Sequence, residues 1–129
     1  MSATNFDAGP LGGIRDGGSL TMSVEGSPDR VVIHLHGELD TMGRLRFREQ
    51  IRSMLGRGGS EVVIDVSDLG GIDVAGLAAL LRADLLLRGV HSRLYVEGAR
   101  PAFVELLRST GLEGRLQVAA AEPAGRATP

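Results

Sequence analysis

The sequence predicts an α/β fold in which helices pack against a mixed β-sheet, with the element order β-β-α-β-α-β-α-β. Three observations support this fold class. Strand-like segments alternate with segments whose apolar residues recur at helical spacing. The strand at residues 61–66 is almost entirely apolar, which is typical of a covered sheet centre. The chain has 129 residues, 43% of them apolar and 23% charged, as expected of one globular core.

Composition marks off both ends of the chain. Residues 1–18 contain three pairs of turn-forming residues, Gly9-Pro10, Gly12-Gly13 and Gly17-Gly18, and predict a flexible arm. Residues 119–129 are rich in Ala, Pro and Gly and predict a flexible tail. The folded domain is therefore predicted at residues 19–118.

The first two strands are predicted to form an antiparallel hairpin. Residues 20–25 alternate apolar and polar side chains, and residues 31–36 form a second run with strand composition. Between them, residues 26–29 read Gly-Ser-Pro-Asp, which is typical of a tight turn.

A helix is predicted from Met42 to Leu55, because the Gly-Glu-Leu-Asp segment at residues 37–40 breaks the strand pattern before it. Its apolar residues recur at helical spacing, and glycines in residues 56–59 end it. A second face, which we interpret as solvated, carries Arg44, Arg48 and Arg52.

A longer helix is predicted at residues 74–88, and Gly89 is expected to end it as a typical C-terminal glycine. Apolar residues almost encircle this helix, so we expect it to be well buried. Its exposed edge should be marked by Arg82, Asp84 and Arg88.

Shorter elements complete the predicted fold. Residues 92–96 form a strand, and Pro101 is well suited to the first position of a third helix that Gly111 closes. Residues 116–118 are predicted to form a last edge strand.

Composition also excludes several classes of function. A net charge of −2 provides no basic face for nucleic acid, and 3% aromatic residues supply few stacking platforms for bases. The absence of cysteine excludes disulfides, thiolate metal sites and cysteine catalysis. Without a long apolar run or a signal-peptide pattern, we expect a cytoplasmic protein with no membrane insertion.

The start of the longer helix is the most informative site in the sequence. Asp73 is placed to cap the helix, and Gly76 three residues later permits close packing. Free backbone N–H groups and the helix dipole make such an opening a natural place for a phosphate or a partner's carboxylate. The two positions that would carry a hydroxyl group are Val74 and Ala75, so neither can be phosphorylated.

Four motifs in this chain resemble those of a STAS domain, the sulfate-transporter and anti-sigma-factor-antagonist module. They are residues 37–40, the strand at residues 62–65, the Ile72-Asp73-x-x-Gly76-Leu77 helix start, and the Ser-Thr-Gly-Leu segment at residues 109–112. The resemblance covers residues 20–118. STAS proteins that consist of a single domain of this size are similar to bacterial anti-sigma factor antagonists.

The resemblance implies a protein partner and a contact surface, and it implies no cofactor. Such antagonists bind an anti-sigma factor, often with a kinase-like ATPase fold, and so free a sigma factor for transcription. The implied contact residues lie at the starts of two helices, with Arg82 and Arg88 at the rim: Asp40, Thr41, Asp73, Val74, Ala75, Gly76 and Leu77.

One feature of the family is missing. In the family, the partner phosphorylates a Ser or Thr just before the glycine of the helix start, in the pattern Asp-Ser-Ser/Thr-Gly, and the phosphate blocks the complex. This chain has Asp73-Val74-Ala75-Gly76, so Ala75 occupies the phosphoacceptor position. A phosphate at this position would add about −1.5 to −2 charges at the interface and oppose binding. Because Ala75 cannot carry a phosphate, we expect constitutive binding.

Simpler roles compete for several of these residues. Asp73 is expected chiefly as a helix cap, and Asp40 is expected either as a cap shared with Thr41 or as a partner contact. His34 and His36 lie on the same side of one strand, but a pair without a visible carboxylate or thiolate companion is a weak metal site. We therefore expect strand residues that are hydrogen-bonded or half-exposed. Five carboxylates look like a cluster but lack the deep pocket that catalysis needs: Glu38, Asp40, Asp65, Asp68 and Asp73.

Three hypotheses for function follow. The first is an anti-sigma factor antagonist-like binding protein without serine phosphorylation control. The second is a small STAS subunit of a lipid or solute transport ATPase. The third is a sensor that binds a nucleotide or anion at the Asp73 helix start. An enzyme is least expected, because no nucleophile–base pair or metal-ligand set is recognisable.

Overall fold

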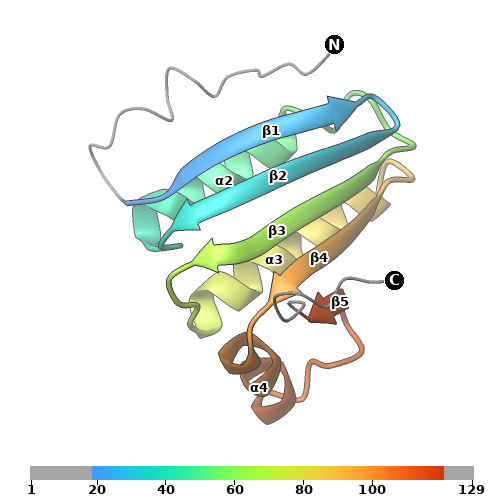
Figure 1. The fold of residues 1–129 in the computed structure, drawn as a ribbon. Coiled ribbons are helices and arrows are strands. Elements are labelled where there is room, and N and C mark those ends of the chain that lie inside the picture. The colour runs from blue at the N-terminus through green and yellow to red at the C-terminus, as the bar shows by residue number, and fades with distance from the viewer. Residues whose placement is uncertain (1–18, 121–129) are drawn as a thin grey trace, which may run out of the picture.

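The computed structural model describes residues 19–120, which form a five-stranded sheet and three helices (Figure 1). The elements in chain order are β1 (Thr21–Ser27), β2 (Arg30–Gly37), α2 (Thr41–Arg52), β3 (Glu61–Leu69), α3 (Val74–Arg88), β4 (Arg93–Ala99), α4 (Pro101–Ser109) and β5 (Gln117–Ala120). The predicted fold class and element order are confirmed.

The sheet is mixed because its first pair of strands differs from the others. β1 and β2 pair antiparallel across a two-residue turn at Pro28 and Asp29, which confirms the predicted hairpin. The remaining neighbours, β2·β3, β3·β4 and β4·β5, are parallel, and the strand order follows the chain from β1 to β5. Parallel strands need crossover connections, and helices provide them here.

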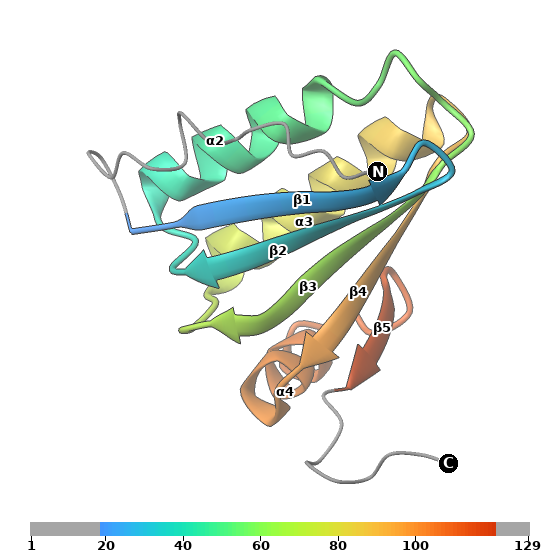
Figure 2. The ribbon, with the colours of Figure 1, turned by 45° about the horizontal axis from the view of Figure 1, so that its top comes forward.

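The two longer helices, α2 and α3, cover one face of the sheet, while the opposite face lies open (Figure 2). The core forms between this covered face and the helices, since alternate residues of the central strand point toward the helices. Val62, Ile64 and Val66 of β3 are buried there with Phe47 and Leu80. Burial of such side chains supplies most of the stabilisation of a domain this size.

The longer helix has the predicted bounds, and Arg82 and Arg88 are exposed as predicted, but the predictions for Asp84 and for the leucines near the end of the helix are wrong. Leu85 is 67% exposed, whereas Asp84 is only 6% exposed. The buried Asp84 carboxylate pairs with Arg88 one turn later, with 3.0 Å between Oδ2 and Nε. Asp84 therefore does not mark the exposed edge of α3.

Several predicted ends shift by a few residues. α2 ends at Arg52 rather than Leu55, and the segment beyond it consists of turns. Gly89 follows α3 but has right-handed φ, and the left-handed residue is His91 at φ 65°. β5 includes Ala119 and Ala120, which were predicted to lie in the tail. The predicted arm at residues 1–18 and the rest of the tail lie outside the described residues.

Within residues 19–120, every helix falls short of the length and apolar character that a membrane-spanning helix needs.

Candidate protein-binding surface at the helix starts

The starts of α2 and α3 lie side by side at one edge of the sheet. β2 and β3 are parallel neighbours, so the segments that follow them emerge at the same edge (Figure 1). The backbone N–H of Gly70 donates to the carbonyl oxygen of Gly37 at 2.6 Å and ties the two segments together. The starts of α2 and α3 therefore form one surface from residues more than 30 positions apart.

Gly37 shapes the first of these segments. Its φ is +100°, and a Cβ atom added there would lie 2.2 Å from the Ser19 carbonyl oxygen. Only glycine adopts such a conformation without strain, and here it also makes room for a neighbouring backbone. The turn at residues 37–40 thus depends on its first residue.

Both aspartates at the helix starts act as N-caps. Asp40 Oδ1 accepts the Gly43 N–H at 2.8 Å, and Asp73 Oδ1 accepts the Gly76 N–H at 2.8 Å. The expected capping roles of Asp73 and Asp40 are confirmed. Each carboxylate satisfies a free helix donor and complements the positive end of the dipole.

The predicted contact residues divide into an exposed set and a supporting set. Asp40, Thr41, Asp73 and Ala75 are exposed, and Val74 is an apolar residue with 59% of its surface accessible. Gly76 is buried and Leu77 is only 1% exposed, so both lie beneath this surface.

Gly76 allows the starts of α2 and α3 to pack closely. A Cβ atom there would lie 3.0 Å from Ile72 Cγ1 and 3.4 Å from Leu39 Cδ2. A side chain at residue 76 would require the Ile72 side chain to shift by a few tenths of an ångström, so the predicted close packing at Gly76 is confirmed. We call the five exposed residues, Asp40, Thr41, Asp73, Val74 and Ala75, the helix-start surface.

A groove of about 500 Å³ runs between α2 and α3 and begins at this surface. Its lining includes Thr41 and Ala75, and four arginines: Arg44, Arg48, Arg52 and Arg82. The sequence alone indicates no more than a plain solvated helix face for the first three. The four-residue spacing of these arginines indicates from sequence that they share one face of α2. Only the packing of α3 against α2 makes that face one wall of a groove.

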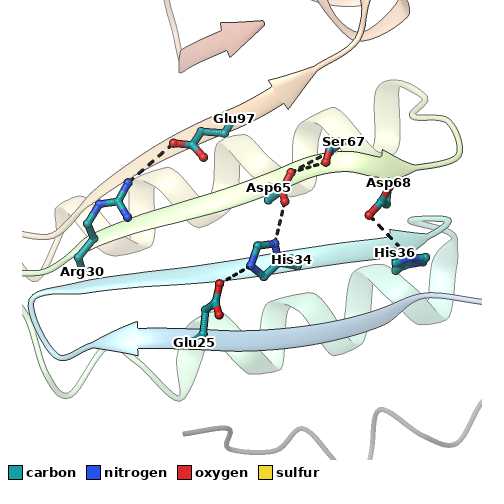
Figure 3. A network of polar contacts seen from close by, with 8 residues as sticks. All are labelled: Glu25, Arg30, His34, His36, Asp65, Ser67, Asp68 and Glu97. Atoms are coloured by element: carbon teal, nitrogen blue, oxygen red, sulfur yellow. Dashed lines mark hydrogen bonds and ion pairs between the residues drawn. The ribbon is translucent and has the colours of Figure 1, made fainter. Parts of the chain in front are cut away.

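The open face of the sheet carries a separate polar cluster centred on His34 (Figure 3). His34 Nδ1 lies 2.7 Å from Asp65 Oδ2, and His34 Nε2 lies 2.8 Å from Glu25 Oε2. The other Asp65 oxygen accepts hydrogen bonds from the backbone N–H and hydroxyl group of Ser67. The expectation that His34 is a satisfied strand residue is confirmed, although the sequence did not reveal its carboxylate partners.

This environment changes two pKa values. Partial burial opposes the charged form of His34, but hydrogen bonds to Glu25 and Asp65 outweigh it and raise the His34 pKa above 6.5. Partial burial likewise opposes ionisation of Asp65, but hydrogen bonds from Ser67 and His34 outweigh it and lower the Asp65 pKa below 3.8.

Four of the five carboxylates that look clustered in the sequence have separate partners. Asp65 and Asp68 lie near His34 and His36, with His36 Nε2 3.8 Å from Asp68 Oδ2, while Asp40 and Asp73 cap helices. Among residues 19–120, no three side chains of His, Cys, Asp or Glu are arranged to hold a metal ion. The aspartates therefore act as local structural partners and do not converge on one site.

Comparison with known proteins identifies the family of this chain. A family model described as "Mlab, STAS domain" matches residues 22–119. No curated protein matches the chain by sequence.

Solved structures share the fold. The unphosphorylated anti-sigma factor antagonist SpoIIAA of Bacillus is similar with a TM-score of 0.65 and 22% identity, over 78% of this chain and 89% of its own. An anti-sigma factor antagonist from Mycobacterium paratuberculosis gives a TM-score of 0.68 and 22% identity, over 82% of this chain and 90% of its own.

The fold also occurs inside a larger protein. The murine anion transporter Slc26a9 matches with a TM-score of 0.58 and 12% identity, over 94% of this chain but 20% of the transporter. The family match covers nearly all of the described residues, and the structural matches agree with it. The chain therefore belongs to the STAS domain family and has the fold of solved anti-sigma factor antagonists.

Proposed function

We propose that the protein is a non-catalytic binding module that acts as an anti-sigma factor antagonist. It binds an anti-sigma factor, of kinase-like ATPase fold, through the helix-start surface and thereby regulates sigma-factor-dependent transcription. One observation carries this proposal: two helix starts distant in sequence form one exposed surface, in a fold shared with anti-sigma factor antagonists.

The chemistry of the surface indicates what it contacts. Asp73 directly precedes the exposed apolar residue Val74 in the chain, and Asp40 is a second exposed carboxylate at the start of α2. Each carboxylate uses one oxygen for capping, and its second oxygen is able to accept a bond from a cationic partner residue. An anion would meet negative charge at both helix starts, so this chemistry favours a protein surface with basic and apolar residues over an anion sensor.

Ala75 determines how binding is controlled. SpoIIAA has been solved in both unphosphorylated and phosphorylated forms. At the position that the family resemblance assigns to the phosphoacceptor, this chain has a methyl group, which cannot accept phosphate. We infer that its binding is not switched off at residue 75.

Calorimetry with purified candidate anti-sigma factors from the same genome tests the binding proposal. We expect a complex that Val74→Arg weakens by at least about tenfold, because the new charge meets the basic partner surface. Leu85→Arg is the matched control, since Leu85 is an exposed apolar residue at the far end of the same helix. It should leave the affinity within about twofold. Failure of every candidate to bind would contradict the proposal.

Mass spectrometry tests whether the protein lacks control by phosphorylation. After incubation with the partner and ATP, the mass of the protein should be unchanged, whereas Ala75→Ser should gain one phosphate. Ala75→Glu should weaken the complex, since it places negative charge where the surfaces meet. A phosphate added to the natural chain at Thr41, Ser67 or Ser109 would overturn constitutive binding.

A further inference from the structure

The groove between α2 and α3 has an apolar floor and a basic rim. Phe47 and Ile51 of α2 and Ala83 of α3 line its floor, and Leu45 and Leu86 are exposed apolar residues along it. We call it the arginine groove after the four rim residues Arg44, Arg48, Arg52 and Arg82.

The rim arginines form a regular array. Arg44, Arg48 and Arg52 follow one another at four-residue intervals along α2, so their Cα atoms rise by about 6 Å per step. Arg82 lies on the α3 wall. An α-helix places its own i, i+4 and i+8 residues at the same interval, so a helix lying along the groove is able to match the array residue by residue.

The positive charge of this array has no counterpart among residues 19–120. Arg30, Arg88 and Arg108 each lie within 4.0 Å of a carboxylate oxygen, but none of the four rim arginines has a described carboxylate within that distance. Within the described part of the chain, Arg44 donates only to the Leu39 carbonyl oxygen and the Thr41 hydroxyl oxygen, each at 3.3 Å. This concentration of positive charge occurs on a chain whose net charge is −2.

Small side chains make the groove suitable for a helix. Ala75, Ala79 and Ala83 follow each other along α3 at four-residue spacing and line the groove, so a helical segment is able to approach closely. The groove is a concave channel between two helices, and a flat membrane surface would touch its rims and leave the floor empty. The shape and the charge of the groove together favour an acidic, amphipathic helix as its ligand.

We propose that the arginine groove binds an acidic amphipathic helix of a protein partner, with apolar residues on the floor and Asp or Glu residues against the four arginines. The proposal goes beyond the proposed antagonist function. Thr41 and Ala75 border both surfaces, but the groove needs neither an anti-sigma factor nor the aspartates of the helix-start surface.

Selection of helical peptides from a displayed, randomised single-helix library against the full-length protein tests this proposal. We expect the selected peptides to be enriched in Asp or Glu at four-residue spacing on one side and in Leu, Ile or Met on the adjoining side. Their affinity, measured by fluorescence anisotropy, should fall as salt is added, since exposed ion pairs are screened.

Charge reversal locates the binding. The double variant Arg48→Glu and Arg82→Glu changes one exposed arginine on each wall, and it should weaken the selected peptides by about tenfold or more. The control variant Arg57→Glu and Arg115→Glu makes the same change of net charge at exposed positions outside the groove. It should leave the affinity within about twofold. Circular dichroism establishes that both variants fold.

A charge swap supplies the decisive comparison. Replacing the acidic residues of a selected peptide with Lys should abolish binding to the natural protein and restore binding to the Arg48→Glu, Arg82→Glu variant. Selected peptides without acidic enrichment, or equal binding to both double variants, would overturn the proposal. It would also be overturned if vesicles of anionic phosphatidylglycerol, but no peptide, bound in an Arg48- and Arg82-dependent manner.

The test is independent of the antagonist proposal. Val74→Arg, which is expected to disrupt the helix-start surface, should not change the affinity for peptides that lie along the groove floor beyond Ala79. Loss of groove binding alone would contradict this inference, and loss of anti-sigma factor binding alone would contradict the antagonist function.

Discussion

At the scale of single residues, His34 joins three strands through its ring. Its two ring nitrogens face carboxylates from β1 and β3, so only the protonated imidazolium can donate to both at once. In the neutral form one nitrogen lacks a hydrogen and faces carboxylate lone pairs. The contact between the hairpin and the centre of the sheet therefore depends on pH.

The direction of this dependence follows from the shifted pKa values. Because the His34 pKa is raised, its contribution to stability is complete below pH 6.5 and is lost as pH rises through the folded-state value. Because the Asp65 pKa is lowered, its contribution is present above pH 3.8 and is lost as pH falls through the folded-state value. Between these limits both contributions are present.

We expect His34→Gln to reduce the free energy of unfolding more at about pH 5.5 than at about pH 8.5. The difference should be at most about 1 kcal/mol, because His34 and Glu25 are partly exposed and screened by solvent. Urea titrations at the two pH values measure it. His36→Gln is the control, since His36 Nε2 lies 3.8 Å from the Asp68 carboxylate, beyond hydrogen-bond distance. Equal pH dependence in both variants would contradict the role of His34.

Gly37 controls the geometry of the helix-start surface. We expect Gly37→Ala to lower the free energy of unfolding by at least about 2 kcal/mol, because the added Cβ would overlap the Ser19 carbonyl oxygen in a strained left-handed conformation. Gly114→Ala is the control, since a Cβ there meets no atom within 4 Å. Denaturant titration compares the two variants. A Gly37→Ala protein as stable as the control would show that the turn relaxes freely.

At the scale of elements, α3 shows where periodicity succeeds and where it fails. Its bounds were predicted because Asp73 caps one end and Gly89 follows the other. The exposure of Arg82 and Arg88 was also predicted, but the burial of Asp84 and the exposure of Leu85 were not, because a helix with apolar residues all round has no preferred apolar face. Packing against α2 and the sheet selects which leucines are covered.

A matched pair of substitutions in α3 tests this selection. Leu80→Ala should cost about 2–5 kcal/mol of unfolding free energy, because Leu80 is fully buried and its loss leaves a cavity. Leu85→Ala is the same substitution at an exposed position, and should change stability by less than about 0.5 kcal/mol. Thermal or denaturant unfolding of both variants measures the contrast. Similar losses would show that Leu85 is covered in solution.

At the scale of the whole molecule, the sheet order predicts uneven local stability. β3 pairs with neighbours on both sides and contributes to the core, whereas β5 is a four-residue edge strand that, among the described strands, pairs only with β4. Native-state hydrogen exchange should therefore be slowest for β3 amides bonded to neighbouring strands and much faster for bonded amides of β5. Equal protection of the two strands would indicate that the sheet opens only as a unit.

The sequence by itself determined the fold class, the order of eight elements and the caps of α2 and α3. These follow from local patterns, because caps, turns and apolar periodicity act over a few neighbouring residues. Only the tertiary structure decided that Asp84 is buried, that Leu85 is exposed, that His34 meets Glu25 and Asp65, and that three arginines form a groove wall with Arg82 opposite. Each of these depends on contacts between segments distant in the chain, and packing between elements settles which side of each element meets a neighbour.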